Sequence, residues 1–185
     1  MFGFHGTGKE KADLVLKDGF KISKTKNVPN DLGTGIYFYI DSEFGEPPEI
    51  MARNFCCIFR KVPKTKVNII KSEINENARL LDFDIKSNLV ELSKFRNENL
   101  DNVKSILKSL ENGNGLKKRG NLDGIAIELY VNYLNEKYAT QIAGVKRSTF
   151  TRNEEVIKYK ASNIPNGKEL CIYETSYILS NVLYS

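Results

Sequence analysis

The stretches Phe4-His5-Gly6-Thr7 and Gly33-Thr34-Gly35-Ile36-Tyr37-Phe38 decide the fold of this protein. The first predicts a strand that ends at Gly6, and the second predicts a sharp glycine turn that leads into an apolar strand. His5 is the only histidine in the chain, so any chemistry that needs an imidazole must use it. The two stretches therefore place the candidate chemistry on two strands near the N-terminus.

The residue types in these stretches suit a flat ligand that carries an amide. Gly6 has no side chain, so a ligand could approach its backbone and meet an N–H and a C=O group beside the imidazole. A carboxamide needs one hydrogen-bond donor and one acceptor, which such a backbone offers. Tyr37 adds a flat aromatic face and a hydroxyl group. We therefore expect a flat heterocycle with an amide substituent.

These residues resemble the catalytic domain of the poly(ADP-ribose) polymerase family, the diphtheria-toxin-like branch of the ADP-ribosyltransferases. That family has a His-Gly-Thr or His-Gly-Ser strand end, a Gly-x-Gly-Ile-Tyr-Phe strand and a glutamate on a late strand. The segment Lys168-Glu169-Leu170-Cys171-Ile172-Tyr173-Glu174 is similar to the late strand. The resemblance implies a His–Tyr–Glu set formed by His5, Tyr37 and Glu169.

Two further segments resemble the family pattern. Residues 18–23 are similar to its segment after the first helix, and residues 52–56 are similar to Ser-Ala-Asn-Tyr-Cys. The aromatic residue of the second segment forms a wall around nicotinamide, and the serine that helps to hold the carboxamide falls at Ala52 here. Residues 60–160 have no counterpart in the pattern. The NAD-binding residues that the resemblance implies are His5, Gly6, Thr7, Ser23, Tyr37 and Phe55.

The resemblance also implies a mechanism in which NAD is the substrate and no metal takes part. Cleavage of the bond to nicotinamide builds positive charge on the ribose, as in glycoside cleavage. A nearby carboxylate stabilises that charge, and Glu169 is the implied group. His5 would hold a ribose by hydrogen bonding, and Tyr37 and Phe55 would enclose the nicotinamide ring, whose amide the Gly6 backbone would hold.

Other late residues compete for these roles. Glu154, Glu155 and Glu174 are alternative carboxylates. Glu174 lies five residues beyond Glu169, so the two face opposite sides of a strand and only one can point into the site. The segment 147–151 is similar to the Ser-Thr-Ser element of the other transferase branch, but no Glu-x-Glu follows it. We interpret that segment as a structural edge strand.

The hydrophobic pattern predicts an α+β fold whose sheet comes from both ends of the chain around a helical middle. The resemblance makes this an ADP-ribosyltransferase-like split sheet, mixed or antiparallel, in a single domain 1–185 with flanking helices and a helical insertion at about 84–140. Loops are expected at 24–32, 44–48 and 112–121, and a short strand or extended turn at 20–22. The expected strands are 1–7, 36–40, 67–74, 80–83, 141–150, 170–174 and 177–184, and the expected helices are 10–17, 48–59, two within 86–110, and 123–138.

The composition limits the class of protein. The chain has 185 residues, typical of one domain, and neither an apolar run long enough for a membrane span nor a signal peptide. Cys56, Cys57 and Cys171 form no C-x-x-C spacing and only one histidine is present, so free thiols in a reducing cytoplasm are expected rather than a zinc site. A net charge of +5 permits a polyanionic partner, although a solvated basic surface would give the same charge.

The leading functional hypothesis is an NAD-dependent ADP-ribosyltransferase, a glycosyltransferase that modifies a protein, RNA or DNA acceptor. The resemblance suggests a cytoplasmic bacterial or phage toxin or an anti-phage defence effector, with an antitoxin or immunity partner. An NAD glycohydrolase and a non-catalytic NAD- or ADP-ribose-binding module are the alternatives. A tRNA 2′-phosphotransferase-type protein shares the fold, but its site needs several arginines and histidines, and this chain has a single histidine.

Overall fold

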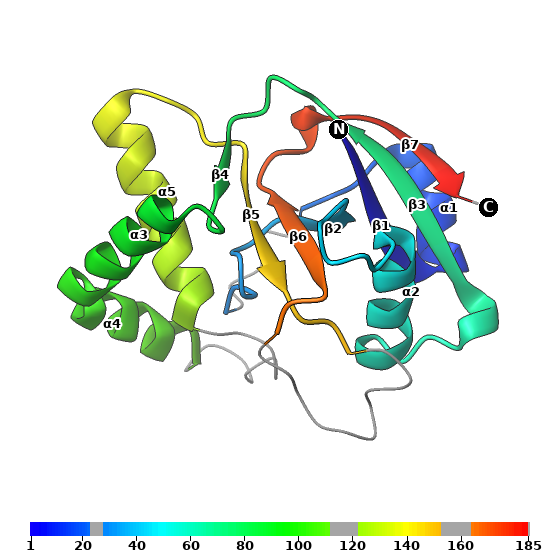
Figure 1. Ribbon diagram of the computed structural model, residues 1–185, viewed down its shortest axis with the longest axis horizontal. Coiled ribbons are helices and arrows are strands. Elements are labelled where there is room, and N and C mark those ends of the chain that lie inside the picture. The colour runs from blue at the N-terminus through cyan, green and yellow to red at the C-terminus, as the bar shows by residue number, and fades with distance from the viewer. Residues whose placement is uncertain (23–27, 112–121, 153–163, 185) are drawn as a thin grey trace.

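The computed structural model of the chain describes residues 1–22, 28–111, 122–152 and 164–184 (Figure 1). Ser23, Glu154, Glu155, the expected loop 112–121 and residues 24–27 of the expected loop 24–32 lie outside the described residues. The α-helices are α1 (Lys9–Asp18), α2 (Pro48–Phe59), α3 (Lys86–Glu98), α4 (Leu100–Glu111) and α5 (Leu122–Tyr138). The strands are β1 (Phe2–Gly8), β2 (Ile36–Ile40), β3 (Val67–Ile74), β4 (Leu80–Asp82), β5 (Gly144–Thr149), β6 (Gly167–Ile172) and β7 (Ile178–Tyr184).

The strands form one mixed sheet in the order β4-β5-β6-β2-β1-β3-β7. Only β4 and β5 pair in parallel, and the other neighbours are antiparallel. This confirms the α+β class, with strands from both ends of the chain around a helical middle. All residues of β1 pair with β3, whereas β1 and β2 share the single register pair Phe4 and Tyr39. The sheet is therefore continuous, with a weak seam between β1 and β2.

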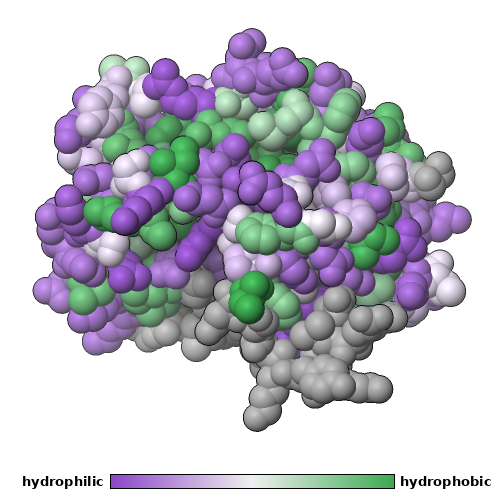
Figure 2. All heavy atoms as spheres, viewed as in Figure 1, coloured by the Kyte–Doolittle hydropathy of each residue, from purple (hydrophilic) through white to green (hydrophobic). Residues whose placement is uncertain are grey.

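Helices cover the sheet in two groups (Figure 1). The helices α3, α4 and α5 lie at the β4 end of the sheet, and α1 and α2 lie toward the β3 and β7 end. Because side chains alternate along β2, Phe38 packs on the same side as Ala12 of α1, whereas Tyr39 packs against Met51 of α2. Ile127 of α5 packs with β5 and β6. Figure 2 shows hydrophilic side chains over most of one molecular face, with apolar groups between them.

The backbones of β1 and α2 touch at Gly6. A Cβ atom on Gly6 would lie 2.1 Å from the carbonyl oxygen of Ala52, so no other residue fits there without moving the helix. Proline at the first position of α2 suits the helix start, because the missing N–H group has no partner there. The position that a side chain on Gly6 would take is thus filled by α2, which gives this glycine a packing role that the sequence did not reveal.

Two local predictions differ from the structure. Residues 20–22 have no regular secondary structure. Strand β6 begins at Gly167, earlier than expected, and ends at Ile172 before Glu174. Residues 147–149 of the segment 147–151 pair with β6 only, because β4 pairs with β5 at residues 144–146, so they form a local edge of the sheet, as expected. The parallel pairing of β5 with β4 joins residues distant in sequence, which local patterns do not encode.

The structure adds two findings on the class of protein. The helices that it describes include none with both the length and the apolar character required to cross a bilayer. Cys56, Cys57 and Cys171 are free thiols, and Cys56 and Cys171 are buried.

Replacing Gly6 with alanine tests the contact between β1 and α2. We expect Gly6→Ala to lower the free energy of unfolding by about 2 kcal/mol, because the helix backbone must shift to relieve the overlap. Gly8→Ala is the matched control, since the nearest atom to a Cβ there, Val62 Cγ1, is 3.8 Å away. Chemical denaturation of both variants measures the difference. Equal stability of the two variants would contradict the close contact.

Candidate functional site

Two adjoining cavities lie at the seam between β1 and β2. Both are lined by residues of β1, β2, α2 and β6 and by the residue that follows α2. These five residues are His5, Tyr37, Phe55, Glu169 and Arg60. The larger has a volume of about 150 Å³ and also contacts Asn30 and Asp31, and the smaller reaches Gly6, Tyr39 and Ala52. The structure thus brings together His5 of β1, Tyr37 of β2 and Glu169 of β6.

His5 bridges the seam with its side chain. Its Nδ1 atom lies 2.7 Å from the carbonyl oxygen of Tyr37, and its Nε2 atom lies 3.2 Å from Nη1 of Arg60. A guanidinium only donates hydrogen bonds and a carbonyl only accepts them, so Nδ1 donates to Tyr37 and Nε2 accepts from Arg60. Burial, together with the positive charge of Arg60, lowers the pKa of His5 to about 4. The imidazole is therefore neutral at pH 7.

Tyr37 uses its hydroxyl group to fix the glycine turn. The hydroxyl donates to the carbonyl of Gly33 at 2.8 Å and accepts from the backbone N–H of Leu32 at 2.9 Å. Gly33 has φ 95°, which favours glycine. Burial raises the pKa of Tyr37 far above its ordinary value, so the phenol stays protonated. What Tyr37 offers to the cavity is the ring, because its hydroxyl is committed to the turn.

Glu169 is the late carboxylate at this site. It is 8% exposed and lies on β6 directly opposite Tyr39 of β2. Glu174 lies beyond the end of β6, is exposed and accepts a hydrogen bond from Gln141. Of these two competing carboxylates, only Glu169 lines the cavities.

Arg60, immediately after α2, was not predicted from the sequence. Its Nη1 atom lies 3.3 Å from the carbonyl oxygen of Gly6, and its Cζ atom lies 5.7 Å from the ring centre of Phe55. An arginine at a helix end is usually a solvated surface residue, so no pattern in the sequence marks Arg60 as part of a site. It places a guanidinium between the imidazole, the Gly6 backbone and an aromatic ring.

The other predicted site residues have different surroundings. Thr7 is buried and lines neither cavity, and Ser23 lies outside the described residues. Ala52, where the family pattern has serine, is buried and contributes to the wall of the smaller cavity. The part of the chain that the structure describes contains no group of three or more side chains suited to hold a metal ion.

This arrangement suits a flat ring beside a developing positive charge. A cavity of about 150 Å³ can hold one six-membered ring, so a dinucleotide would extend beyond it. Tyr37 and Phe55 offer aromatic faces, and Glu169 offers a mostly buried carboxylate. Arg60 can bind an anion with several parallel hydrogen bonds.

No protein-family model, curated protein or solved structure matches the chain. The likeness to ADP-ribosyltransferases therefore rests on the motif residues of the sequence.

The pKa of His5 gives a direct test of the site, because a single histidine produces one set of imidazole NMR signals. We expect these signals to titrate near pH 4. Arg60→Gln removes a positive charge next to the ring and should raise the pKa, whereas Arg60→Lys should keep it low. An unfolded histidine titrates near pH 6.5. As the pH falls, the unfolded state therefore takes up a proton on His5 before the folded state does. The contribution of His5 to stability should fall as the pH drops from about 6.5 to 4. A pKa near 6.5 in the folded protein would contradict this environment.

Proposed function

We propose that this protein is an NAD-dependent ADP-ribosyltransferase that transfers ADP-ribose to a macromolecular acceptor. The observation that carries the proposal is the meeting of His5, Tyr37 and Glu169 around cavities that Phe55 also lines. The motif resemblance selected Glu169 from a segment more than a hundred positions after His5 and Tyr37 in the sequence. The types of these three residues alone give no reason for them to line the same cavities.

The surroundings of each site residue decide which part of NAD it would contact. The nicotinamide ring would lie against Tyr37 and Phe55, and its amide would meet the backbone of Gly6. Arg60 now donates to the Gly6 carbonyl, so it would turn away from that oxygen and pair with the pyrophosphate. Nε2 of the neutral His5 would then accept a hydrogen bond from a ribose hydroxyl.

The chemistry places the greatest demand on Glu169. The bond between ribose C1′ and the nicotinamide nitrogen breaks, and nicotinamide leaves as a neutral molecule with the bonding electrons. Positive charge builds on the ribose, and a carboxylate that is 8% exposed stabilises it more strongly than one in water. An acceptor atom then bonds to C1′ and releases its proton to solvent. No metal is needed for these steps.

Two features of the site favour a second candidate, a non-catalytic NAD- or ADP-ribose-binding module. Ala52 lacks the hydroxyl group that the family uses to hold the carboxamide, and the Gly6 carbonyl already has Arg60 as a donor. An NAD glycohydrolase would use the same residues with water as the acceptor. Release of nicotinamide with and without a macromolecular acceptor separates the three functions.

The biological setting belongs to the same proposal. The free thiols Cys56, Cys57 and Cys171 support a cytoplasmic location. A role as a bacterial or phage toxin or an anti-phage effector, with an antitoxin or immunity partner, follows from the motif resemblance alone.

Replacing Glu169 with glutamine tests the transferase. We expect Glu169→Gln to reduce nicotinamide release and ADP-ribose transfer by about 10²–10³-fold, because a neutral amide cannot stabilise the developing charge. The dissociation constant for NAD should change little, since the side-chain shape is kept. Labelled NAD measures transfer, and calorimetry measures binding.

Glu174→Gln is the matched control, because this exposed carboxylate lies on the same segment outside the cavities. It should behave as the wild type. Normal transfer by Glu169→Gln would place the carboxylate role elsewhere, and a wild-type protein that neither binds NAD nor releases nicotinamide would refute the proposed function.

A further inference from the structure

A separate, larger cavity lies at the end of the sheet where β2 and β5 end and β6 begins. Its volume is about 590 Å³, within the range of ligand-binding pockets. Its lining includes Ser42 and Phe44 after β2, Arg147 and Ser148 of β5, and Lys168 of β6. All of these lie in the part of the chain that the structure describes, and none belongs to the NAD site proposed above.

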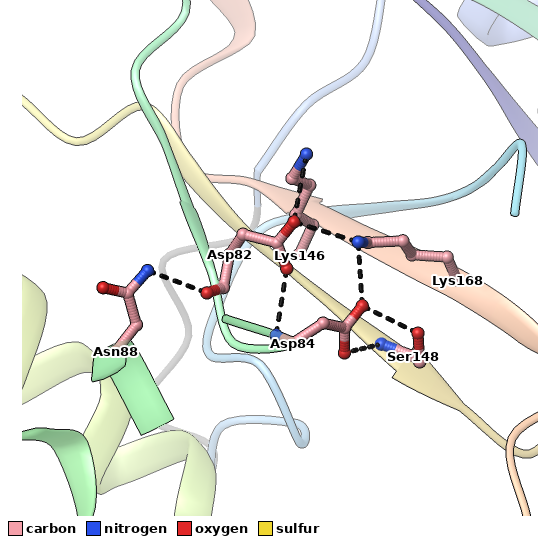
Figure 3. Close-up of polar contacts among 6 residues, drawn as sticks. All are labelled: Asp82, Asp84, Asn88, Lys146, Ser148 and Lys168. Carbon is pink, nitrogen blue, oxygen red and sulfur yellow. Dashed lines mark hydrogen bonds and ion pairs between the residues drawn. The ribbon is translucent and has the colours of Figure 1, made fainter. Parts of the chain in front are cut away.

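An ion-pair network fixes one wall of this cavity (Figure 3). Asp84 accepts hydrogen bonds from the backbone N–H and the hydroxyl of Ser148, at 2.8 and 2.7 Å, and its carboxylate lies 2.8 Å from Nζ of Lys168. Asp82 pairs with Lys168 at 2.9 Å and with Lys146 at 3.2 Å. The two lysines are thus neutralised by carboxylates, and the ends of β5 and β6 are held in place. The cavity is therefore built on fixed elements.

Arg147 differs from these lysines. It is half-buried and makes no ion pair or side-chain hydrogen bond with the residues that the structure describes, although it lines the large cavity. The hydroxyl oxygen of Ser42 lines the same cavity, is buried and has no hydrogen-bond partner among the described residues. Buried polar groups are nearly always hydrogen-bonded, so the Ser42 hydroxyl calls for a partner. Together with the guanidinium of Arg147 beside the same cavity, it points to an anionic ligand that accepts hydrogen bonds.

The register of the sheet places this cavity beside the candidate catalytic carboxylate. Arg147 of β5 lies directly opposite Glu169 of β6. Directly opposed side chains project from the same face, with Cβ atoms about 5 Å apart. Glu169 lines the two small cavities and its cross-strand neighbour Arg147 lines the large one, so this residue pair joins the two regions. A transferase with two substrates needs both of its binding regions close to the catalytic group.

We propose that the large cavity binds the acceptor and that the acceptor is a single-stranded nucleic acid; this rests on the proposed transferase function. Arg147 would bind a phosphate next to the modified nucleotide. Phe44, which is 45% exposed, offers a ring on which a base can stack. The exposed carboxylates of Asp41 and Glu43 can accept hydrogen bonds from base amino groups. The net charge of +5 favours a polyanion over an acidic side chain on a protein acceptor.

In the transfer step, the C1′–nitrogen bond of NAD breaks and neutral nicotinamide leaves with the electron pair. A nitrogen or oxygen of the acceptor nucleotide forms the new bond to C1′ and loses one proton to solvent. No oxidant, reductant or other reactant is required.

Binding of short fluorescent single-stranded DNA and RNA, measured by anisotropy without NAD, tests the cavity independently of the transferase activity. We expect Arg147→Ala to weaken binding about tenfold and to reduce the slope of log K against log salt by about 0.7, the value for one phosphate contact. Phe44→Ala, at an exposed position, should weaken binding severalfold without affecting folding. Arg79→Ala, an exposed arginine outside the cavity, should bind as the wild type.

Transfer is then followed with labelled NAD in a cell lysate, and the products are digested with nuclease or protease. We expect the label in the nuclease-sensitive fraction, with a loss of about tenfold in Arg147→Ala at an unchanged dissociation constant for NAD. Label confined to the protease-sensitive fraction would overturn the proposal, as would wild-type oligonucleotide binding by both the Arg147→Ala and Phe44→Ala variants. Oligonucleotide binding through Arg147 without nicotinamide release would instead overturn the transferase function.

Discussion

A hydrogen bond from the imidazole of His5 to the carbonyl of Tyr37 holds the sheet where its two halves begin to separate. The strands β1 and β2 share one register pair, so their ladder supplies little else at this point. The bond, at 2.7 Å, replaces a backbone contact with a side-chain contact and leaves room for the cavities between the strands.

The same bond sets the chemical state of the site. A carbonyl acceptor at Nδ1 and a guanidinium donor at Nε2 are compatible only with one neutral tautomer of His5. Burial and the charge of Arg60 keep the pKa of the ring low, so no second positive charge forms near that guanidinium. A neutral imidazole and a mostly buried carboxylate suit a reaction in which positive charge appears on the substrate.

The sequence predicted the local elements well. The bounds of β2, α2 and β3 agree with the expected ranges 36–40, 48–59 and 67–74, because each has a strong apolar pattern and clear flanking residues. The seam, the inner position of β5 and the contact of Gly6 with Ala52 were not predictable. They depend on pairings between segments far apart in sequence, and one sequence shows no sign of such pairings.

The residues of the candidate site, like the fold, were predictable from the sequence only in part. The motifs named His5, Tyr37, Phe55 and Glu169, and the structure places these four around the same cavities. Arg60 was missed, because its role depends on where a flexible side chain reaches after the helix ends. Thr7 is part of the motif but lines neither cavity, which shows that a motif names neighbours in sequence and not the groups that face a ligand.

Strand β6 links the two regions of the molecule through consecutive residues. Lys168 and Glu169 point to opposite faces of the sheet, because side chains alternate along a strand. Lys168 is held by Asp82 and Asp84, and this fixes the start of β6 on one face while Glu169 lines the small cavities on the other. The ion pairs are only partly exposed, so they restrain the strand more than a solvated surface pair would. The ion-pair network in Figure 3 therefore restrains the strand that carries Glu169 without contacting Glu169 itself. Because Arg147 and Glu169 are cross-strand neighbours, a shift of β5 or β6 would change the positions of both.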